Sequence, residues 1–196
     1  MSAFEEREDE RAVFRAAETM LCKEKTLLLA IDGRCAAGKT TLAEKLKQRF
    51  GCGVLHMDDF FLRPFQRTPA RLAEPGGNVD YERFLNEVLC PLSQGREAVF
   101  RPWRCHTQSF GDPVRISAGP LVVTEGSYSC HPALRKYYGL RVFLSVSPQE
   151  QLRRIEKRNG PEATVVFREK WIPLEELYFS RCGVEEACEL RLSNEG

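Results

Sequence analysis

The stretch that decides the fold reads Leu27-Leu28-Leu29-Ala30-Ile31-Asp32-Gly33-Arg34-Cys35-Ala36-Ala37-Gly38-Lys39-Thr40-Thr41-Leu42-Ala43. An apolar run leads into a glycine-bounded loop, and a helical pattern follows, so the stretch predicts a strand, a loop and a helix. Gly33 and Gly38 permit tight, partly left-handed backbone, and the loop N–H groups can then surround a phosphate. Lys39 places a cation on the β- and γ-phosphates, and the Thr40 hydroxyl can ligate Mg²⁺. The spacing Gly-x-x-x-x-Gly-Lys-Thr therefore predicts a nucleoside triphosphate site. Its residues are Gly33, Arg34, Cys35, Ala36, Ala37, Gly38, Lys39, Thr40 and Thr41.

Length and charge narrow the class of protein. A chain of 196 residues is the size of one domain with a proper core. The 29 basic residues nearly balance the 28 acidic ones, which favours neither a nucleic-acid nor a membrane partner. The first ten residues are acidic and lack the basic and apolar regions of a signal peptide, so we expect a cytoplasmic protein. The sequence is compatible with a homo-oligomer and does not decide the oligomeric state.

Eight cysteines are many for a chain of this length, yet none forms a Cys-x-x-Cys pair. Adjacent Cys-His neighbours do not make a zinc-binding spacing, so we expect reduced thiols used as small apolar residues. Cys35 lies inside the phosphate loop, which makes it a candidate for oxidative inactivation.

Apolar runs and helical periodicity predict the remaining elements. Strands are expected at 26–31, 54–57, 121–124 and 140–146, and helices at 5–23, 41–50, 80–92, from Pro148 onward, and over most of 166–190. Asp80 and Ser147 are expected to be N-caps, and Asn159-Gly160-Pro161 should end the helix that begins at Pro148. Pro173 should kink the last helix or start a new one. Residues 62–79 read as a long loop, and residues 98–118 as a hairpin or irregular flap that could recognise a substrate.

Acidic residues follow two of the predicted strands. Asp58 and Asp59 come after 54–57, and Glu125 comes after 121–124. In a doubly wound α/β sheet, ligands bind beyond the carboxyl ends of the strands, so these acids should face the phosphate loop. A carboxylate there could accept a proton from an attacking hydroxyl and help to hold Mg²⁺. An ordinary capping or solvated Asp pair explains Asp58 and Asp59 equally well on spacing alone.

The helix from Pro148 carries Arg153, Arg154, Lys157 and Arg158. Arginines three or four residues apart share a helix face and suit phosphate oxygens. A solvated basic face is the alternative.

Over roughly residues 25 to 180, these motifs resemble the uridine kinase and nicotinamide riboside kinase group of P-loop kinases. The most specific likeness is His56-Met57-Asp58-Asp59-Phe60-Phe61, where the group carries its catalytic base, so the resemblance implies that role for Asp58. Asn78-Val79-Asp80 resembles the segment whose acid holds the ribose hydroxyls, and Thr124-Glu125-Gly126 resembles the strand end whose acid organises Mg²⁺. Arg153 to Arg158 resembles the lid, and Phe167 to Phe179 is similar to a small bacterial uridine kinase-like subgroup.

The resemblance implies one P-loop kinase domain over residues 1–196, with a three-layer α/β/α fold, a parallel sheet, a helical lid at about 153–168 and a substrate flap at about 98–118. It implies ATP and Mg²⁺ as cofactors. The implied catalytic residues are Asp58, Lys39, Arg154 and Arg158; the metal ligands are Thr40, Asp58 and Glu125; and the substrate contacts are Asp58, Asp80 and Arg168. Arg104 and His106 are further candidates for substrate contacts because they lie in the flap. The stretch from Pro102 to Ser109 departs from the group, because the aromatic and acidic uridine-reading residues are absent after the proline.

The expected function is therefore phosphorylation of a small molecule, with the 5′-hydroxyl of a uridine-like or cytidine-like nucleoside as the leading acceptor. Nicotinamide riboside, pantothenate and other small alcohols are the alternatives within the kinases. A non-catalytic nucleotide-binding module is the alternative of another class, although it would not need Asp58 and Glu125. A GTPase switch is disfavoured, since the sequence shows neither an Asn-Lys-x-Asp guanine reader nor a suitable Asp-x-x-Gly.

Overall fold

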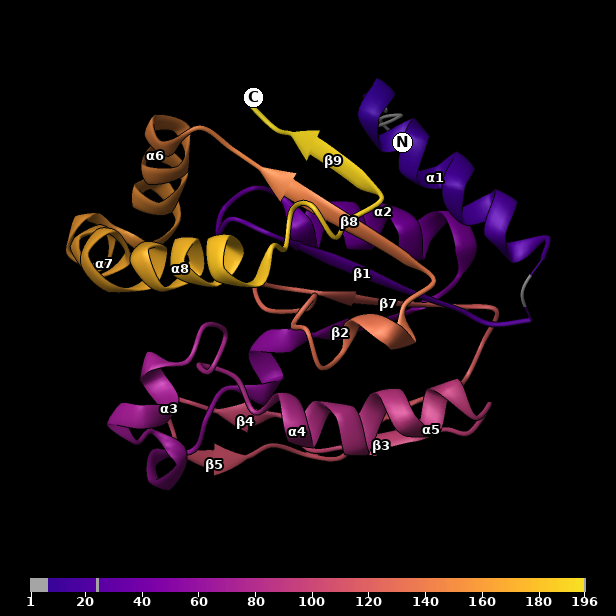
Figure 1. Ribbon diagram of the computed structural model, residues 1–196, viewed down its shortest axis with the longest axis horizontal. Helices are drawn as coiled ribbons and strands as arrows, with labels where there is room; N and C mark the ends of the chain where they lie inside the picture. Colours follow the sequence, from indigo (N-terminus) through magenta and orange to yellow (C-terminus); the bar gives the residue numbers. More distant parts are fainter. Residues whose placement is uncertain (1–6, 24, 196) are drawn as a thin grey trace.

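In the computed structural model, which describes residues 7–23 and 25–195, five parallel strands form one sheet (Figure 1). The strand order is β2-β7-β1-β8-β9, so the strand that leads into the phosphate loop lies at the centre. The strands are β1 (Leu27–Gly33), β2 (Gly53–His56), β7 (Leu121–Glu125), β8 (Leu140–Ser145) and β9 (Leu190–Ser193). Parallel pairing aligns the carboxyl ends of β1, β2 and β7, and this places the acids that follow them at one edge.

Helices cover both faces of this sheet, which confirms the predicted three-layer α/β/α fold. Alternate residues of β1 point to opposite sides: Leu27 and Leu29 join one apolar cluster, and Leu28 joins the other. Helices α1 (Glu8–Leu21) and α2 (Lys39–Phe50) pack in the first cluster. In the second cluster lie α4 (Tyr81–Phe84), α5 (Cys90–Ser93) and α8 (Ile172–Cys182). The predicted start of the first helix at residue 5 lies outside the described residues.

Two prolines sit inside helical segments, and a wide turn precedes each of them. The Cys90 N–H bonds to the Leu85 carbonyl just before Pro91, and the Ile172 N–H bonds to the Phe167 carbonyl just before Pro173. Proline has no N–H and its ring clashes with the carbonyl four residues earlier, so a wider turn accommodates it. The chain consequently stays helical through 81–93. Helix α8 begins at Ile172, which agrees with the expectation that Pro173 starts a new helix.

Residues 166–190 are mostly helical, as predicted, but a strand begins at the end of this range. Helix α8 stops at Cys182 because Gly183 takes a left-handed conformation, with φ of +54°. After a turn, the chain adds β9 beside β8. This strand has four residues, of which Leu192 is buried and Arg191 exposed, and so short an alternation is a weak strand signal.

The segments between the sheet elements surround one end of the sheet. The predicted long loop 62–79 contains a helical turn at Pro64–Gln66 and a short helix α3 (Pro69–Ala73). The flap is a hairpin, as predicted: β3 (Ala98–Phe100) pairs with β6 (Val114–Ile116), and β4 (Trp103–Arg104) pairs with β5 (Ser109–Phe110). Helix α6 (Pro148–Asn159) ends at Gly160 and α7 (Pro161–Val166) follows. In Figure 1, α6, α7 and α8 stand together beside the sheet. Ser147 occupies the N-cap position of α6, but no capping bond from its side chain occurs in the described chain.

No helix within residues 7–23 and 25–195 combines the length and the apolar character needed to cross a membrane.

His131 packs against the first residue of α4, and its partial burial has a consequence for acid stability. The imidazole stacks on Tyr81 with ring centroids 3.9 Å apart. Burial, with a smaller effect of Arg71, lowers its pKa to about 4. Because the unfolded chain titrates near ~6.5, this residue's contribution is fully present above that pH and is lost as the pH falls towards 4.

We therefore expect the free energy of unfolding of the wild type to fall by on the order of 1–2 kcal/mol more than that of His131→Phe between pH 7.5 and 5.0. Phenylalanine keeps an aromatic ring in the stack and removes the titration. Denaturant unfolding of both proteins at both pH values measures the difference. Equal pH dependence of the two proteins would contradict this account.

Candidate active site

The phosphate loop turns sharply at its two glycines. Gly33 has φ of +130°, and a Cβ there would lie 2.0 Å from the Leu144 carbonyl oxygen, so no other residue fits. Gly38 has φ of +98° and precedes the first residue of α2. The loop thus passes close against β8 and leads directly into the start of α2.

Asp32 anchors the start of this loop, a role that sequence reasoning missed. It is fully buried and accepts four hydrogen bonds. Its Oδ1 accepts from the backbone N–H groups of Gly33 (2.7 Å) and Tyr128 (3.2 Å), and its Oδ2 accepts from the Cys130 N–H (2.8 Å) and the Tyr178 hydroxyl (2.8 Å). Burial raises the pKa of this carboxyl. An acid at the end of a buried apolar strand is the sequence signal that could have found it.

Lys39 is almost fully buried and connects the loop to the end of β7. Its Nζ donates to the carbonyl oxygens of Gly33 (2.6 Å) and Arg34 (2.9 Å), and it lies 3.4 Å from the Ser127 Oγ. The ammonium group of Lys39 thus lies between the loop and the neighbouring strand end.

Glu125 forms a cluster of oxygen ligands with the first turn of α2. The Thr40 hydroxyl donates to its Oε1 over 3.2 Å, and the Nδ1 of His56 lies 2.6 Å from the same oxygen. This hydrogen bond raises the pKa of His56. Hydroxyl and carboxylate oxygens are the ligands that Mg²⁺ prefers, and it is usually held by one or two carboxylates plus substrate phosphates. The side-chain oxygens of Thr40, Asp58 and Glu125 are therefore suitable ligands for Mg²⁺. In the described chain no group of three or more His, Cys, Asp or Glu side chains forms a closed metal site.

Asp58 follows β2 and lies beside this cluster. Desolvation and the charge of Glu125 raise its pKa. Asp58 and Glu125 line the same cavity. Asp59 points elsewhere, because its Oδ1 lies 3.8 Å from the Arg104 guanidinium of the flap. Asp58 and Asp59 thus have different surroundings, which their adjacent positions in the sequence do not reveal.

A cavity of about 640 Å³ opens between the loop, the strand ends, the flap and the helices α6 to α8. Its walls are formed by Cys35, Ala36, Gly38, Lys39, Thr40, Thr41, Asp58, Phe61, Arg67, Asn78, Cys105, Glu125, Gly126, Ser127, Tyr128, Arg154, Arg158, Phe167, Trp171 and Glu175. Six residues predicted for catalysis or metal binding therefore meet at one cavity: Lys39, Thr40, Asp58, Glu125, Arg154 and Arg158.

The two predicted lid arginines differ in their surroundings. Arg154 reaches the phosphate loop and donates to the Ala36 carbonyl over 3.2 Å, while Glu150 holds its Nε over 2.7 Å. Arg158 lies at the cavity wall, one turn further along α6, and donates to the Asn159 side chain. Arg154 is thus already placed on the loop, whereas Arg158 is more exposed.

Four predicted substrate residues lie away from the cavity wall. Asp80 caps the helix at Tyr81 as expected, and its other oxygen accepts from Gln66 over 2.8 Å. Arg104 and His106 are exposed on the flap, and Arg168 is exposed and pairs with Glu169. Asn78, two residues before Asp80, reaches the wall instead.

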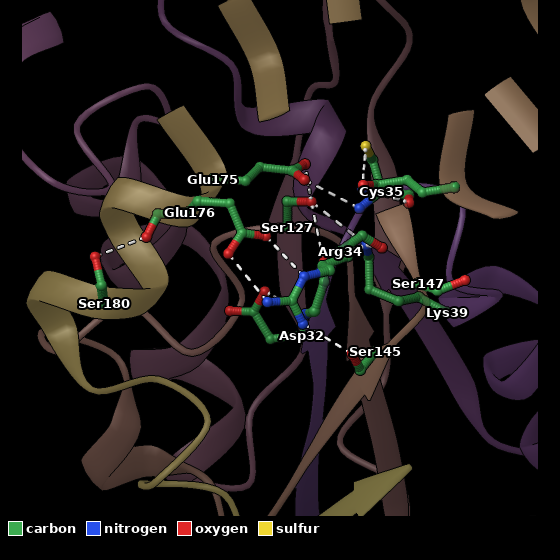
Figure 2. Close-up of polar contacts among 12 residues, drawn as sticks. Asp32, Arg34, Cys35, Lys39, Ser127, Ser145, Ser147, Glu175, Glu176 and Ser180 are labelled. Atoms are coloured by element: carbon green, nitrogen blue, oxygen red, sulfur yellow. Dashed lines mark hydrogen bonds and ion pairs between the residues drawn. The ribbon is translucent and has the colours of Figure 1, made fainter. Parts of the chain in front are cut away.

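Helix α8 contributes two carboxylates that sequence reasoning did not assign to the site (Figure 2). Glu176 forms a two-pronged ion pair with Arg34, at 2.7 and 3.0 Å, which turns this loop side chain towards α8. Glu175 accepts the Cys35 N–H over 3.0 Å and the Ser127 hydroxyl over 2.6 Å. The helix is therefore tied directly to the phosphate loop.

The thiol of Cys35 is not a reactive group in this setting. Burial and the neighbouring Glu175 raise its pKa to about 12, so little thiolate exists at neutral pH. This environment disfavours the expected oxidation at Cys35. All eight cysteines lie among the described residues, and each is a free thiol.

A parallel sheet of this order, with a glycine-rich loop between its central strand and a helix, is the fold of the P-loop kinases. The structure is similar to one described as a possible uridine kinase from Bacillus stearothermophilus, with a TM-score of 0.69 and 18% identity over 95% of this chain and 100% of that one. It is similar to D-glycerate 3-kinase from Cryptococcus neoformans, with a TM-score of 0.63 and 14% identity over 96% of each chain. Phosphoribulokinase from Rhodobacter spheroides gives a TM-score of 0.58 and 12% identity over 86% of this chain and 70% of that one. No family model and no curated protein matches the sequence. At these identities the likeness establishes the fold, which confirms the predicted fold class.

Proposed function

We propose that the protein is a kinase that transfers the γ-phosphoryl group of ATP to a hydroxyl of a small molecule. The observation that carries this proposal is the single cavity that brings Lys39 and Thr40 together with Asp58 and Glu125. A non-catalytic nucleotide-binding module would need the loop but not a buried carboxylate beside it. The structural neighbours named as kinases support the proposal at the level of the fold.

Each group of residues at the cavity has its own role in the proposed reaction. The loop N–H groups and Lys39 hold the phosphates, and Asp58 accepts the proton of the attacking hydroxyl. Thr40, Asp58 and Glu125 would hold Mg²⁺, which neutralises phosphate charge when bound. Arg154, and Arg158 as a lid residue, would close over the phosphates and exclude water. Placement and charge neutralisation then supply most of the rate.

A nucleoside is the acceptor that we favour. The residues that line the cavity include the aromatic Phe61, Tyr128 and Trp171 as well as Asp58 and Asn78, which suits a flat base next to a reacting hydroxyl. The likeness of the Asp58 segment to uridine kinases points to the 5′-hydroxyl. The lid at 153–168, the flap at 98–118, and the roles of Asp80, Arg104, His106 and Arg168 belong to this proposal.

A specific observation favours a second acceptor class, a small alcohol that carries a carboxylate or phosphate. A recess of about 370 Å³ adjoins the cavity and shares Arg67, Asn78 and Trp171 with it. The recess also contains Glu169, whose carboxylate pairs with Arg168. Within the described chain, no ion pair joins Arg67 or Lys170 of this recess to an acid, and the Arg67 Nε donates to the Leu62 carbonyl. Two such cations could bind an anionic acceptor.

The test is ADP release with Mg·ATP against uridine, cytidine, nicotinamide riboside, pantothenate and D-glycerate. Turnover of any acceptor supports the kinase. Binding of ATP with turnover of none, together with no phosphorylated product by mass spectrometry, would favour a binding module.

Arg67→Gln separates the two acceptor classes. If the acceptor is anionic, we expect its KM to rise about tenfold or more with kcat little changed, since one charged hydrogen bond is lost. A nucleoside should show a KM within about threefold of wild type, because no anion is being held. Lys136→Gln, a basic surface residue on a different segment, is the control.

A further inference from the structure

Glu175, the last residue of the segment Trp171-Ile172-Pro173-Leu174-Glu175, has no role in the mechanism above, yet it contacts the phosphate loop. Glu175 is only 6% exposed. Its Oε2 accepts the Cys35 N–H, and its Oε1 accepts the Ser127 hydroxyl, at 3.0 and 2.6 Å (Figure 2). Ser127 also lies 3.4 Å from the ammonium of Lys39. One carboxylate thus spans the loop and the end of β7.

These donors are of the kind that a phosphate would use. Backbone N–H groups of a loop that precedes a helix bind anions, and a carboxylate offers two acceptor oxygens, as a phosphate edge does. A single N–H cannot serve both anions at full strength, and two anions repel strongly in a cavity with little water. The carboxylate of Glu175 therefore occupies a position at the Cys35 N–H where a phosphate oxygen would bind.

The neighbouring carboxylate does not compete in this way. Glu176 bonds to the Arg34 side chain, and Arg34 also donates to the Ser145 hydroxyl over 2.8 Å and stacks between Phe143 and Phe179. This contact uses no backbone N–H of the loop. Helix α8 is thus held to the loop at two points, of which only the one at Glu175 takes a donor from the phosphate site.

We propose that Glu175 is an internal competitor for the triphosphate, a residue that must leave the Cys35 N–H before a phosphate oxygen can bind there. The proposal rests on the proposed function, since it requires that ATP binds at this loop. Glu175 lowers the affinity for ATP, and ATP binding frees the start of α8, whose preceding turn carries Trp171 at the cavity wall. Nucleotide binding is in this way coupled to the helical segment 161–182.

The experiment measures the Kd of the non-hydrolysable analogue adenylyl imidodiphosphate, with Mg²⁺, by titration calorimetry. Three variants are compared with the wild type: Glu175→Gln, Glu175→Asp and Glu176→Gln. Aspartate keeps the charge but is shorter by one carbon–carbon bond, about 1.5 Å, and so loses its reach to the Cys35 N–H. We expect the Kd to fall about tenfold in both Glu175 variants, as one charge-assisted hydrogen bond no longer competes. In Glu176→Gln, which removes the same charge one residue away, the Kd should stay within about threefold of wild type.

Each other outcome overturns the inference. A Kd that is unchanged or higher in both Glu175 variants would show that Glu175 positions the loop for the nucleotide. A lower Kd in Glu175→Gln and Glu176→Gln but not in Glu175→Asp would show a general effect of charge. Should Glu175→Gln have a lowered Tm, Glu175→Asp decides alone. If neither the wild type nor any variant binds the analogue, the proposed function itself fails; if the wild type binds it and the Glu175 variants bind no tighter, only this inference fails.

Discussion

Replacement of Asp58 by asparagine is expected to lower kcat by about 10²- to 10⁴-fold and to leave the Kd for ATP within about threefold. Asparagine has the shape of aspartate but cannot accept the proton of the attacking hydroxyl. Desolvation beside the cavity and the charge of Glu125 raise the pKa of Asp58, and its side chain stays exposed to the space that an acceptor would enter. Single-turnover kinetics with the preferred acceptor, together with calorimetry for ATP, measure the two quantities separately.

Asp59→Asn is the matched control for this prediction. It makes the same chemical change one residue away, on a carboxylate that faces Arg104 of the flap. We expect its kcat to fall less than about tenfold. The wild-type pH profile offers a further check, since kcat/KM should decline on the acid side through a pKa above that of an ordinary aspartate. Full turnover by Asp58→Asn would assign the base to another group.

Replacement of Asp32 by alanine is expected to reduce the free energy of unfolding by about 3–5 kcal/mol. The change leaves the N–H groups of Gly33, Tyr128 and Cys130 and the hydroxyl of Tyr178 without an acceptor in a fully buried place. Unpaired donors in the interior lose their bonds to water without compensation. Denaturant unfolding at pH 7.5 measures the loss. The same variant should also bind ATP poorly, because Gly33 begins the phosphate loop.

Tyr178→Phe is the graded comparison for Asp32. It removes one of the four hydrogen bonds, retains the ring in the core and should cost about 1 kcal/mol. The ratio between the two losses tests whether Asp32 acts as the shared acceptor of the network. If Asp32→Ala proved as stable as Tyr178→Phe, the backbone donors would have found other partners, and the anchoring role would be wrong.

Local patterns predicted those parts of the fold and site in which neighbours along the chain decide the outcome. The Gly33 to Thr41 spacing specified a strand, a turn and a helix start, and the structure has all three. The position of Asp58 and Glu125 at one edge of the sheet could be predicted, because the carboxyl ends of parallel strands meet there and each acid directly follows a strand. The β-like segments of 98–118, which Pro102 and Pro113 interrupt, predicted a hairpin or an irregular flap, and the structure has the hairpin.

The tertiary structure decided what depends on residues far apart in the chain. Glu175 meets Cys35 across 140 positions, and Tyr178 meets Asp32 across 146, and no periodicity records such pairs. Asp80 was predicted to face a substrate, but Gln66 and the helix N-terminus hold it, while Asn78 reaches the wall. Strand β9 was missed because four residues carry too little hydrophobic pattern, and pairing with β8 stabilises it. The sequence by itself thus determined the phosphate loop and the strand-end acids, because local backbone chemistry specifies them. The contact of α8 with that loop and the position of Asn78 at the cavity were decided by the tertiary structure, because they depend on shape and burial summed over the whole chain.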